Sequence, residues 1–164
     1  MKGYTLLEVM VATAVIGVLA VVATNLFFSV SRGGAKVQVT AEVNQNGQIV
    51  LGTMERLIRN SLAVTSACAG EAAGSLTVVD RQAREIVFSC QNVGGDDSYI
   101  ASNSARLTAE NVRVTACAFT CTEDAGGFRP PLIEIDFTLS QKKAGLPGET
   151  QTGQFRTNVS LRNY

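Results

Sequence analysis

The side chains best suited to specific chemistry in this sequence are four cysteines. They are Cys68, Cys90, Cys117 and Cys121. All of them follow a long apolar N-terminal run, and an even number of cysteines in an exported region indicates two disulfides. Four cysteines can also bind zinc, and the short Cys117 to Cys121 spacing suits half of such a site. The wide gap between the other two disfavours that alternative.

Four cysteines permit three pairings, and we favour the one that ties the end of the helix to the second strand. We expect Cys68 to pair with Cys90, and Cys117 to pair with Cys121. Four residues of extended strand span about 13 Å, whereas bridged Cα atoms lie within about 7 Å of each other. The second pair therefore also predicts a bend or tight turn at Phe119-Thr120.

Other reactive side chains do not form a catalytic pattern. The sequence contains no histidine, so the commonest general base and the commonest metal ligand are both missing. The serines lack a nucleophile motif. Glu134 and Asp136 share one face of an expected strand, and that face is predicted to be in solvent. We therefore expect no enzyme activity and no cofactor or resident metal.

Two adjacent acids after two glycines, Gly94-Gly95-Asp96-Asp97, are a possible Ca²⁺ loop. No further regularly spaced oxygen ligands follow them, which favours a solvated turn. The chain holds 14 basic and 14 acidic residues, and this balance gives no indication of nucleic-acid binding.

Glu8 is the one charged residue between Tyr4 and Val30. As a helix, this stretch is about 40 Å long, enough to cross the ~30 Å hydrocarbon core of a bilayer. An acid at the centre of a membrane helix costs about 3 kcal/mol on insertion scales and suggests a function. Glu8 lies near one end, which lowers the cost without explaining the residue.

Three interpretations of this segment are open. A secretory signal peptide cleaved after Ala23 is one, although the apolar run is longer than usual and Glu8 offsets the charge of Lys2. A plain membrane anchor with Glu8 at the interface is the second. The third interpretation is that Gly3 and Glu8 both belong to one processing motif.

The run Gly3-Tyr4-Thr5-Leu6-Leu7-Glu8-Val9 resembles the processing site of type IV prepilins and type II secretion pseudopilins. The resemblance implies that a prepilin peptidase and methyltransferase cuts after Gly3 and N-methylates Tyr4. It also implies that Glu8 engages the N-terminal amine of a neighbouring pilin or pseudopilin subunit during assembly. Residues 1–3 are then a leader peptide, and residues 4–30 form the transmembrane and filament-core helix.

Residues 31–66 continue the helix in amphipathic form, with a flexing point at residues 31–34 and an end near Ser66. Small and apolar residues recur at spacings of three and four. They are Val43, Gly47, Val50, Leu51, Met54, Leu57, Ile58, Ser61 and Leu62. This face suits a core formed with the protein's own sheet better than a coiled-coil partner.

Residues 67–164 are predicted to form a globular β head. Period-two patterns indicate strands at residues 75–80, 84–90, 111–120, 132–140 and 151–162. The buried faces are expected to hold the following residues: Val79, Ile86, Phe88 and Cys90; Val112, Val114, Ala116 and Ala118; Ile133, Ile135, Phe137 and Leu139; Phe155, Thr157, Val159 and Leu161. The prediction is an α+β fold, with a long N-terminal helix packed against a four- or five-stranded antiparallel sheet, similar to pilins.

These features together predict a structural subunit of a type IV pilus-like or type II secretion pseudopilus filament. We expect a single-pass protein of the inner membrane, with its head outside the cytoplasm, that later joins a periplasmic or extracellular filament. The alternative is a membrane-anchored exported binding domain that does not polymerise.

Overall fold

The computed structural model describes residues 5–123, 129–142 and 151–162, without the side chains of residues 31–33, 35 and 36. The chain divides into two compact units, Met1–Gln38 and Val39–Tyr164. The first contains the apolar part of a helix, and the second contains the rest of that helix and all of the strands.

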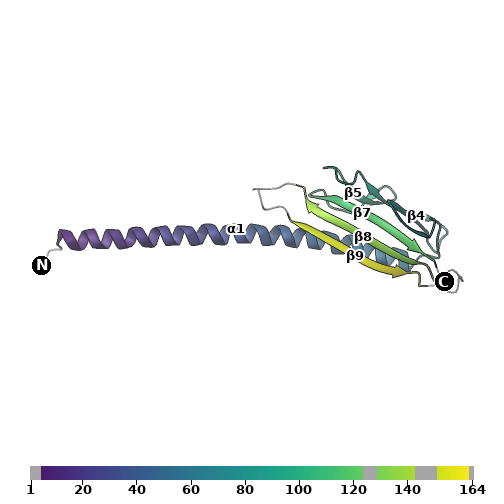
Figure 1. The fold of residues 1–164 in the computed structure, drawn as a ribbon, viewed down its shortest axis with the longest axis horizontal. Helices are drawn as coiled ribbons and strands as arrows, with labels where there is room; N and C mark the ends of the chain where they lie inside the picture. The colour runs from purple at the N-terminus through teal and green to yellow at the C-terminus, as the bar shows by residue number, and fades with distance from the viewer. Residues whose placement is uncertain (1–4, 124–128, 143–150, 163–164) are drawn as a thin grey trace. The chain divides into compact units, whose positions relative to one another are not determined.

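Helix α1 runs from Leu6 to Arg59 without a break, including residues 31–34 (Figure 1). The chain has no proline before position 130, so nothing in this stretch removes a helical hydrogen bond. At the start, the Thr5 side-chain oxygen accepts from the Glu8 N–H at 3.3 Å, as an N-cap does.

The helix ends at Arg59 rather than near Ser66, because the chain leaves it to join a sheet. The Leu62 N–H donates to the Val79 carbonyl at 2.8 Å, which begins antiparallel pairing with that strand. The Arg59 carbonyl at the helix end accepts from the Arg162 N–H at 3.2 Å. Both partners are distant in sequence, so helical periodicity alone overestimated the length of the helix.

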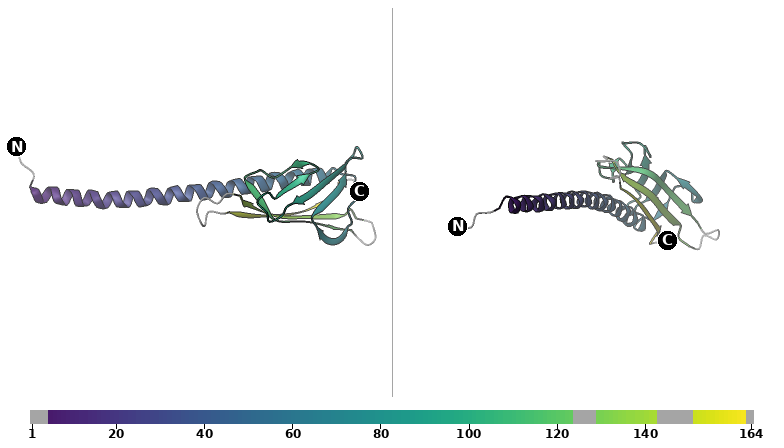
Figure 2. Two further views of the ribbon diagram at one scale, coloured as in Figure 1. Left: turned by 90° about the horizontal axis from the view of Figure 1, so that it is seen from above. Right: turned by 60° about the vertical axis from the view of Figure 1, so that its left-hand side comes forward.

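The head contains two antiparallel sheets rather than one (Figure 1 and Figure 2). The first has the order β1-β3-β4-β5-β6. Its strands are β1 (Ala63–Val64), β3 (Ser75–Val79), β4 (Glu85–Gln91), β5 (Tyr99–Ser102) and β6 (Ala105–Arg106). The second has the order β2-β7-β8-β9. Its strands are β2 (Ala69–Ala73), β7 (Val112–Thr122), β8 (Leu132–Gln141) and β9 (Thr152–Ser160).

The predicted α+β class is confirmed, and the five long predicted strands correspond to β3, β4, β7, β8 and β9. The sequence patterns missed β1, β2, β5 and β6. β1, β5 and β6 have two to four residues, too few for an alternating pattern to stand out. β2 has five residues, but all of them are exposed and its sequence, AGEAA, does not alternate. β5 also lies inside a polar stretch that reads as a loop.

The core of the head lies between the C-terminal part of α1 and the sheets. Val43, Val50, Met54 and Ile58 on α1 are buried in the same apolar cluster as residues of β8 and β9. The amphipathic helical face therefore packs against the protein's own strands, as predicted. Leu62 is an exception: it is 47% exposed, beyond the end of the helix.

Alternation in β8 and β9 is as predicted, with Phe137 and Phe155 among the buried residues. In β3 the prediction was wrong by one residue. Val78 is fully buried and Val79 is half-buried, because Val78 lies opposite Ile86 on the inner face. A one-residue error in register moves every side chain to the other face.

The buried face of β7 changes along the strand because of a bulge. Val112 and Val114 are buried as predicted, but the pairing with β8 shifts between Val114 and Ala116. An extra residue in one strand reverses the alternation beyond it. Phe119 and Cys121 are therefore buried in place of Ala116 and Ala118.

Candidate functional site

The apolar part of α1, Leu6–Val30, is 25 residues long with a mean hydropathy of 2.5. Within the described ranges, it is the one helical stretch long and apolar enough to span a membrane. Its side chains are exposed throughout. Soluble monomers rarely expose continuous apolar surface of this size, so the segment suits an environment of lipid or partner helices.

Two hydroxyls inside this stretch are satisfied by the helix itself. Thr13 donates to the Val9 carbonyl at 3.0 Å, and Thr24 donates to the Ala20 carbonyl at 2.8 Å. Polar groups in an apolar medium are costly unless they find such partners. These two threonines therefore suit a surrounding without water.

Glu8 lies in the first turn of α1, where the helix dipole favours a carboxylate. Its side chain is exposed, and the ion pairs found among residues 5–123, 129–142 and 151–162 do not include it. The predicted processing residues Gly3 and Tyr4 lie outside the described residues. The site thus presents a carboxylate at the tip of an apolar helix.

Residues 1–24 match the family model of the prokaryotic N-terminal methylation motif. The chain carries the signature of a prepilin. This motif marks the prepilins of type IV pilins and pseudopilins, which a prepilin peptidase processes. Neither the search of curated proteins nor the search of solved structures finds a match to the chain.

All four cysteines of the chain form disulfides, as predicted, but the predicted pairing was wrong. Cys68 pairs with Cys121, and Cys90 pairs with Cys117. The zinc alternative is also wrong, because all four sulfurs are bonded in these pairs.

The correct pairing follows from the sheets. β7 has no turn at Phe119-Thr120, since these two residues pair in register with Ile135 and Glu134 of β8. Cys117 and Cys121 are therefore too far apart along one strand to bond to each other. Instead β2 pairs with the end of β7, which brings the Cα of Cys68 to 4.4 Å from that of Cys121.

The second disulfide, with a Cα–Cα distance of 6.0 Å, connects the two sheets. Cys90 belongs to β4 in the five-stranded sheet, and Cys117 belongs to β7 in the four-stranded sheet. The bond therefore fixes the sheets to each other at their interface.

The two acids of the glycine-rich loop form ion pairs with basic side chains. Asp96 pairs with Arg113 at 3.3 Å, and Asp97 pairs with Lys142 at 2.8 Å. The Lys142 ammonium, by hydrogen bonding, lowers the pKa of the Asp97 carboxyl. The part of the chain that the structure describes contains no group of three or more His, Cys, Asp or Glu side chains suited to a metal ion.

Glu134 and Asp136 on β8 also have structural partners. Glu134 forms an ion pair with Arg156, and Asp136 accepts from the Gln154 amide at 3.2 Å. Both partners are on the neighbouring strand β9, on the face away from the core. These acids stabilise the outer surface of the sheet.

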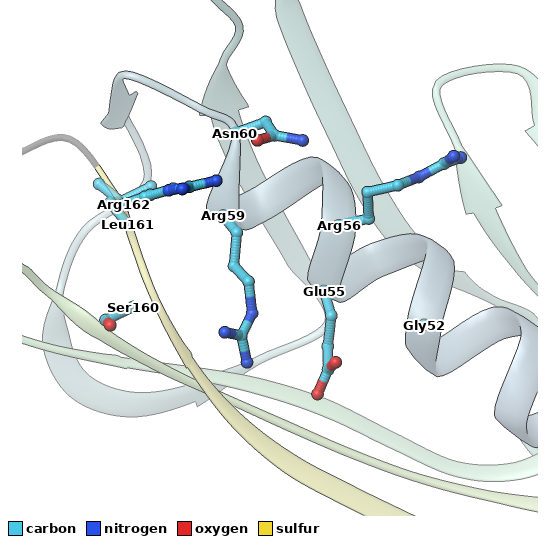
Figure 3. A pocket seen from close by; sticks show the side chains of 8 residues that line it. All are labelled: Gly52, Glu55, Arg56, Arg59, Asn60, Ser160, Leu161 and Arg162. Atoms are coloured by element: carbon cyan, nitrogen blue, oxygen red, sulfur yellow. The ribbon is translucent and has the colours of Figure 1, made fainter.

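A groove of about 520 Å³ lies between the last turns of α1 and the end of β9 (Figure 3). Its lining residues are Gly52, Glu55, Arg56, Arg59, Asn60, Ser160, Leu161 and Arg162. Sequence reasoning missed this site. Arg56 and Arg59 read as a solvated helix face, and nothing in the pattern places Arg162 beside them.

Proposed function

We propose that this prepilin-type protein is a structural subunit of a type IV pilus-like or type II secretion pseudopilus filament. The observation that carries the proposal is the methylation motif at residues 1–24, joined to a fully exposed apolar helix, Leu6–Val30. In this proposal, lipid surrounds the apolar segment before assembly, and the helices of neighbouring subunits surround it afterwards.

In this proposal, residues 1–3 are a leader and the protein first spans the inner membrane once, with its head outside the cytoplasm. Two disulfides fit that location, because disulfides persist in oxidising compartments. Cleavage after Gly3 frees the Tyr4 amine, which the methyltransferase modifies. The processed subunit then leaves the bilayer for the filament.

Assembly follows from the physics of the apolar helix. Packing of apolar surface supplies adhesion but little register, because many axial positions bury similar areas. A carboxylate at Glu8 is costly in an apolar filament core unless it finds a cation. The Tyr4 amine of a neighbouring subunit supplies that cation, so the charge pair selects one register. A head-to-tail contact of this kind does not close, and it propagates as a fibre.

The test is to recover filaments from sheared cells and from the periplasm, remove membranes, and identify the protein in the sedimenting fraction. We expect the processed protein in that fraction. A matched Gly3→Leu variant should remain in the inner membrane, because a bulky side chain just before the cleavage site blocks processing. Wild-type protein found in membranes alone would favour the non-polymerising, membrane-anchored binding domain.

A further inference from the structure

The groove at the end of α1 holds a concentration of unpaired positive charge. Its lining contains three arginines and one acid, Glu55. The ion pairs of the described residues do not include Arg56, Arg59 or Arg162. By contrast, four cations elsewhere in the head have acidic partners: Arg84, Arg113, Lys142 and Arg156.

The arrangement of the groove is set by the fold. The Arg162 N–H donates to the Arg59 carbonyl at 3.2 Å, which attaches the segment after β9 to the end of the helix. Figure 3 shows Arg59 and Glu55 pointing to the same side of α1, whereas Arg56 points away from them at the rim. The Glu55 carboxylate accepts from the Thr157 hydroxyl. The acid is thus held toward β9 while the guanidinium groups stay exposed.

Gly52, at one side of the groove, has no packing reason to be glycine. A Cβ built there meets nothing within 4 Å. A glycine inside a helix costs about 1 kcal/mol relative to alanine, so its presence works against helix stability. What glycine does provide here is an uncovered helix surface, on which another chain can lie close to the backbone.

We propose that this groove docks an acidic peptide segment of a partner protein. Planar guanidinium groups bind carboxylates with two parallel hydrogen bonds. The Arg59 and Arg162 side chains point in different directions (Figure 3), so each can bind a separate carboxylate of the peptide. The Asn60 amide and the Ser160 hydroxyl can hydrogen-bond to the main chain of the peptide. Arg56 at the rim adds long-range attraction for acids.

The lining favours a peptide over a nucleic acid. It contains no aromatic side chain, whereas single-stranded nucleic acids bind largely by stacking on such rings. The Glu55 carboxylate can accept from a peptide N–H, a main-chain donor that a sugar-phosphate backbone does not offer.

The experiment uses the full chain, solubilised in detergent, with a fluorescently labelled hexaglutamate peptide as the probe and fluorescence anisotropy as the readout. A double variant, Arg59→Gln with Arg162→Gln, removes the two central charges. The matched control, Arg113→Gln with Lys142→Gln, removes the same charge from the ion pairs with Asp96 and Asp97. A Gly52→Phe variant fills the groove without changing charge.

We expect saturable binding by the wild type that weakens as salt is raised. The groove double variant should lose about tenfold or more in affinity, as the loss of charge-assisted hydrogen bonds implies. Gly52→Phe should also weaken binding, and the control should change it by less than about twofold, as the loss of surface ion pairs implies. Native disulfide mapping of each variant checks folding.

Three outcomes would overturn the inference. They are no saturable binding by the wild type, an equal loss in the control double variant, and groove-dependent binding of an oligothymidylate that is tighter than that of hexaglutamate. The measurement uses dispersed protein, so its result is independent of filament assembly.

Discussion

The ring of Phe155 in β9 occupies the space that a side chain at position 47 of α1 would need. A Cβ on Gly47 would lie 2.1 Å from the Phe155 Cζ atom. The Phe155 ring also stacks on the Phe137 ring of β8, with ring centroids 5.3 Å apart. Gly47 therefore lets the sheet approach the helix, and this close packing offsets the low helix propensity of glycine.

Gly47→Ala is expected to destabilise the head although alanine is the better helix former. Forcing a methyl group into the Phe155 ring should lower the free energy of unfolding by about 1–3 kcal/mol. Gly52→Ala is the matched control in the same helix, and it should raise that free energy by up to about 1 kcal/mol. Thermal unfolding in detergent, followed by circular dichroism, compares the two. Equal shifts of the same sign would contradict the packing explanation.

Removing either disulfide should lower stability by about 2–4 kcal/mol. The Cys68–Cys121 bond closes 53 residues and the Cys90–Cys117 bond closes 27. On chain entropy alone, the larger loop should contribute about 0.6 kcal/mol more. Paired serine variants at each bond measure this difference. Non-reducing peptide mapping checks the pairing first, and a peptide linking Cys68 to Cys90 would contradict the structure.

Asp80, in the turn between β3 and β4, should make the head sensitive to acid. The Arg84 backbone N–H, followed by the Gln82 N–H and the Arg84 side chain, lowers the pKa of Asp80 below its ordinary value of 3.8. A lowered folded-state pKa gives stability that is present above the unfolded value and is lost as pH falls through the folded value.

Asp80→Asn should therefore lower stability at neutral pH and weaken the pH dependence below the ordinary carboxyl pKa. Unfolding curves recorded between neutral pH and strong acid make the comparison. If the free energy of unfolding fell with pH as steeply in Asp80→Asn as in the wild type, this carboxylate would make no contribution to the acid sensitivity.

Processing should leave Tyr4 as the N-terminal residue, with a methyl group on its amine. Intact-mass spectrometry of assembled protein measures both changes at once. An N-terminus at Met1 would favour the plain anchor, and one at Thr24 would favour a cleaved signal peptide.

Glu8→Val should leave membrane insertion, cleavage at Gly3 and folding of the head intact, yet strongly impair filament incorporation. Glu8→Asp, one methylene shorter, should impair it less. Thr13→Val is the matched control, because the Thr13 hydroxyl is already bonded within its own helix. The readout is the amount of each variant in purified filaments, together with its position along the fibre. Wild-type incorporation of Glu8→Val along the fibre would rule out a role in register.

The sequence by itself determined the features that local pattern encodes. The motif from Gly3 to Glu8 and the apolar run after it led to the prepilin assignment, which the match at residues 1–24 supports. Alternation in β8 and β9 and the helical spacing from Val43 to Ile58 predicted the core faces, because burial repeats with the period of each element.

The tertiary structure alone decided which distant residues meet. The disulfide pairing depends on β2 joining β7 and on the two sheets facing each other, and the buried face of β7 depends on a bulge near Thr115. The groove exists because the chain after β9 returns to Arg59. Such contacts join residues far apart in sequence, and their energies depend on the packing of the whole head. Local periodicity in the sequence therefore cannot predict them.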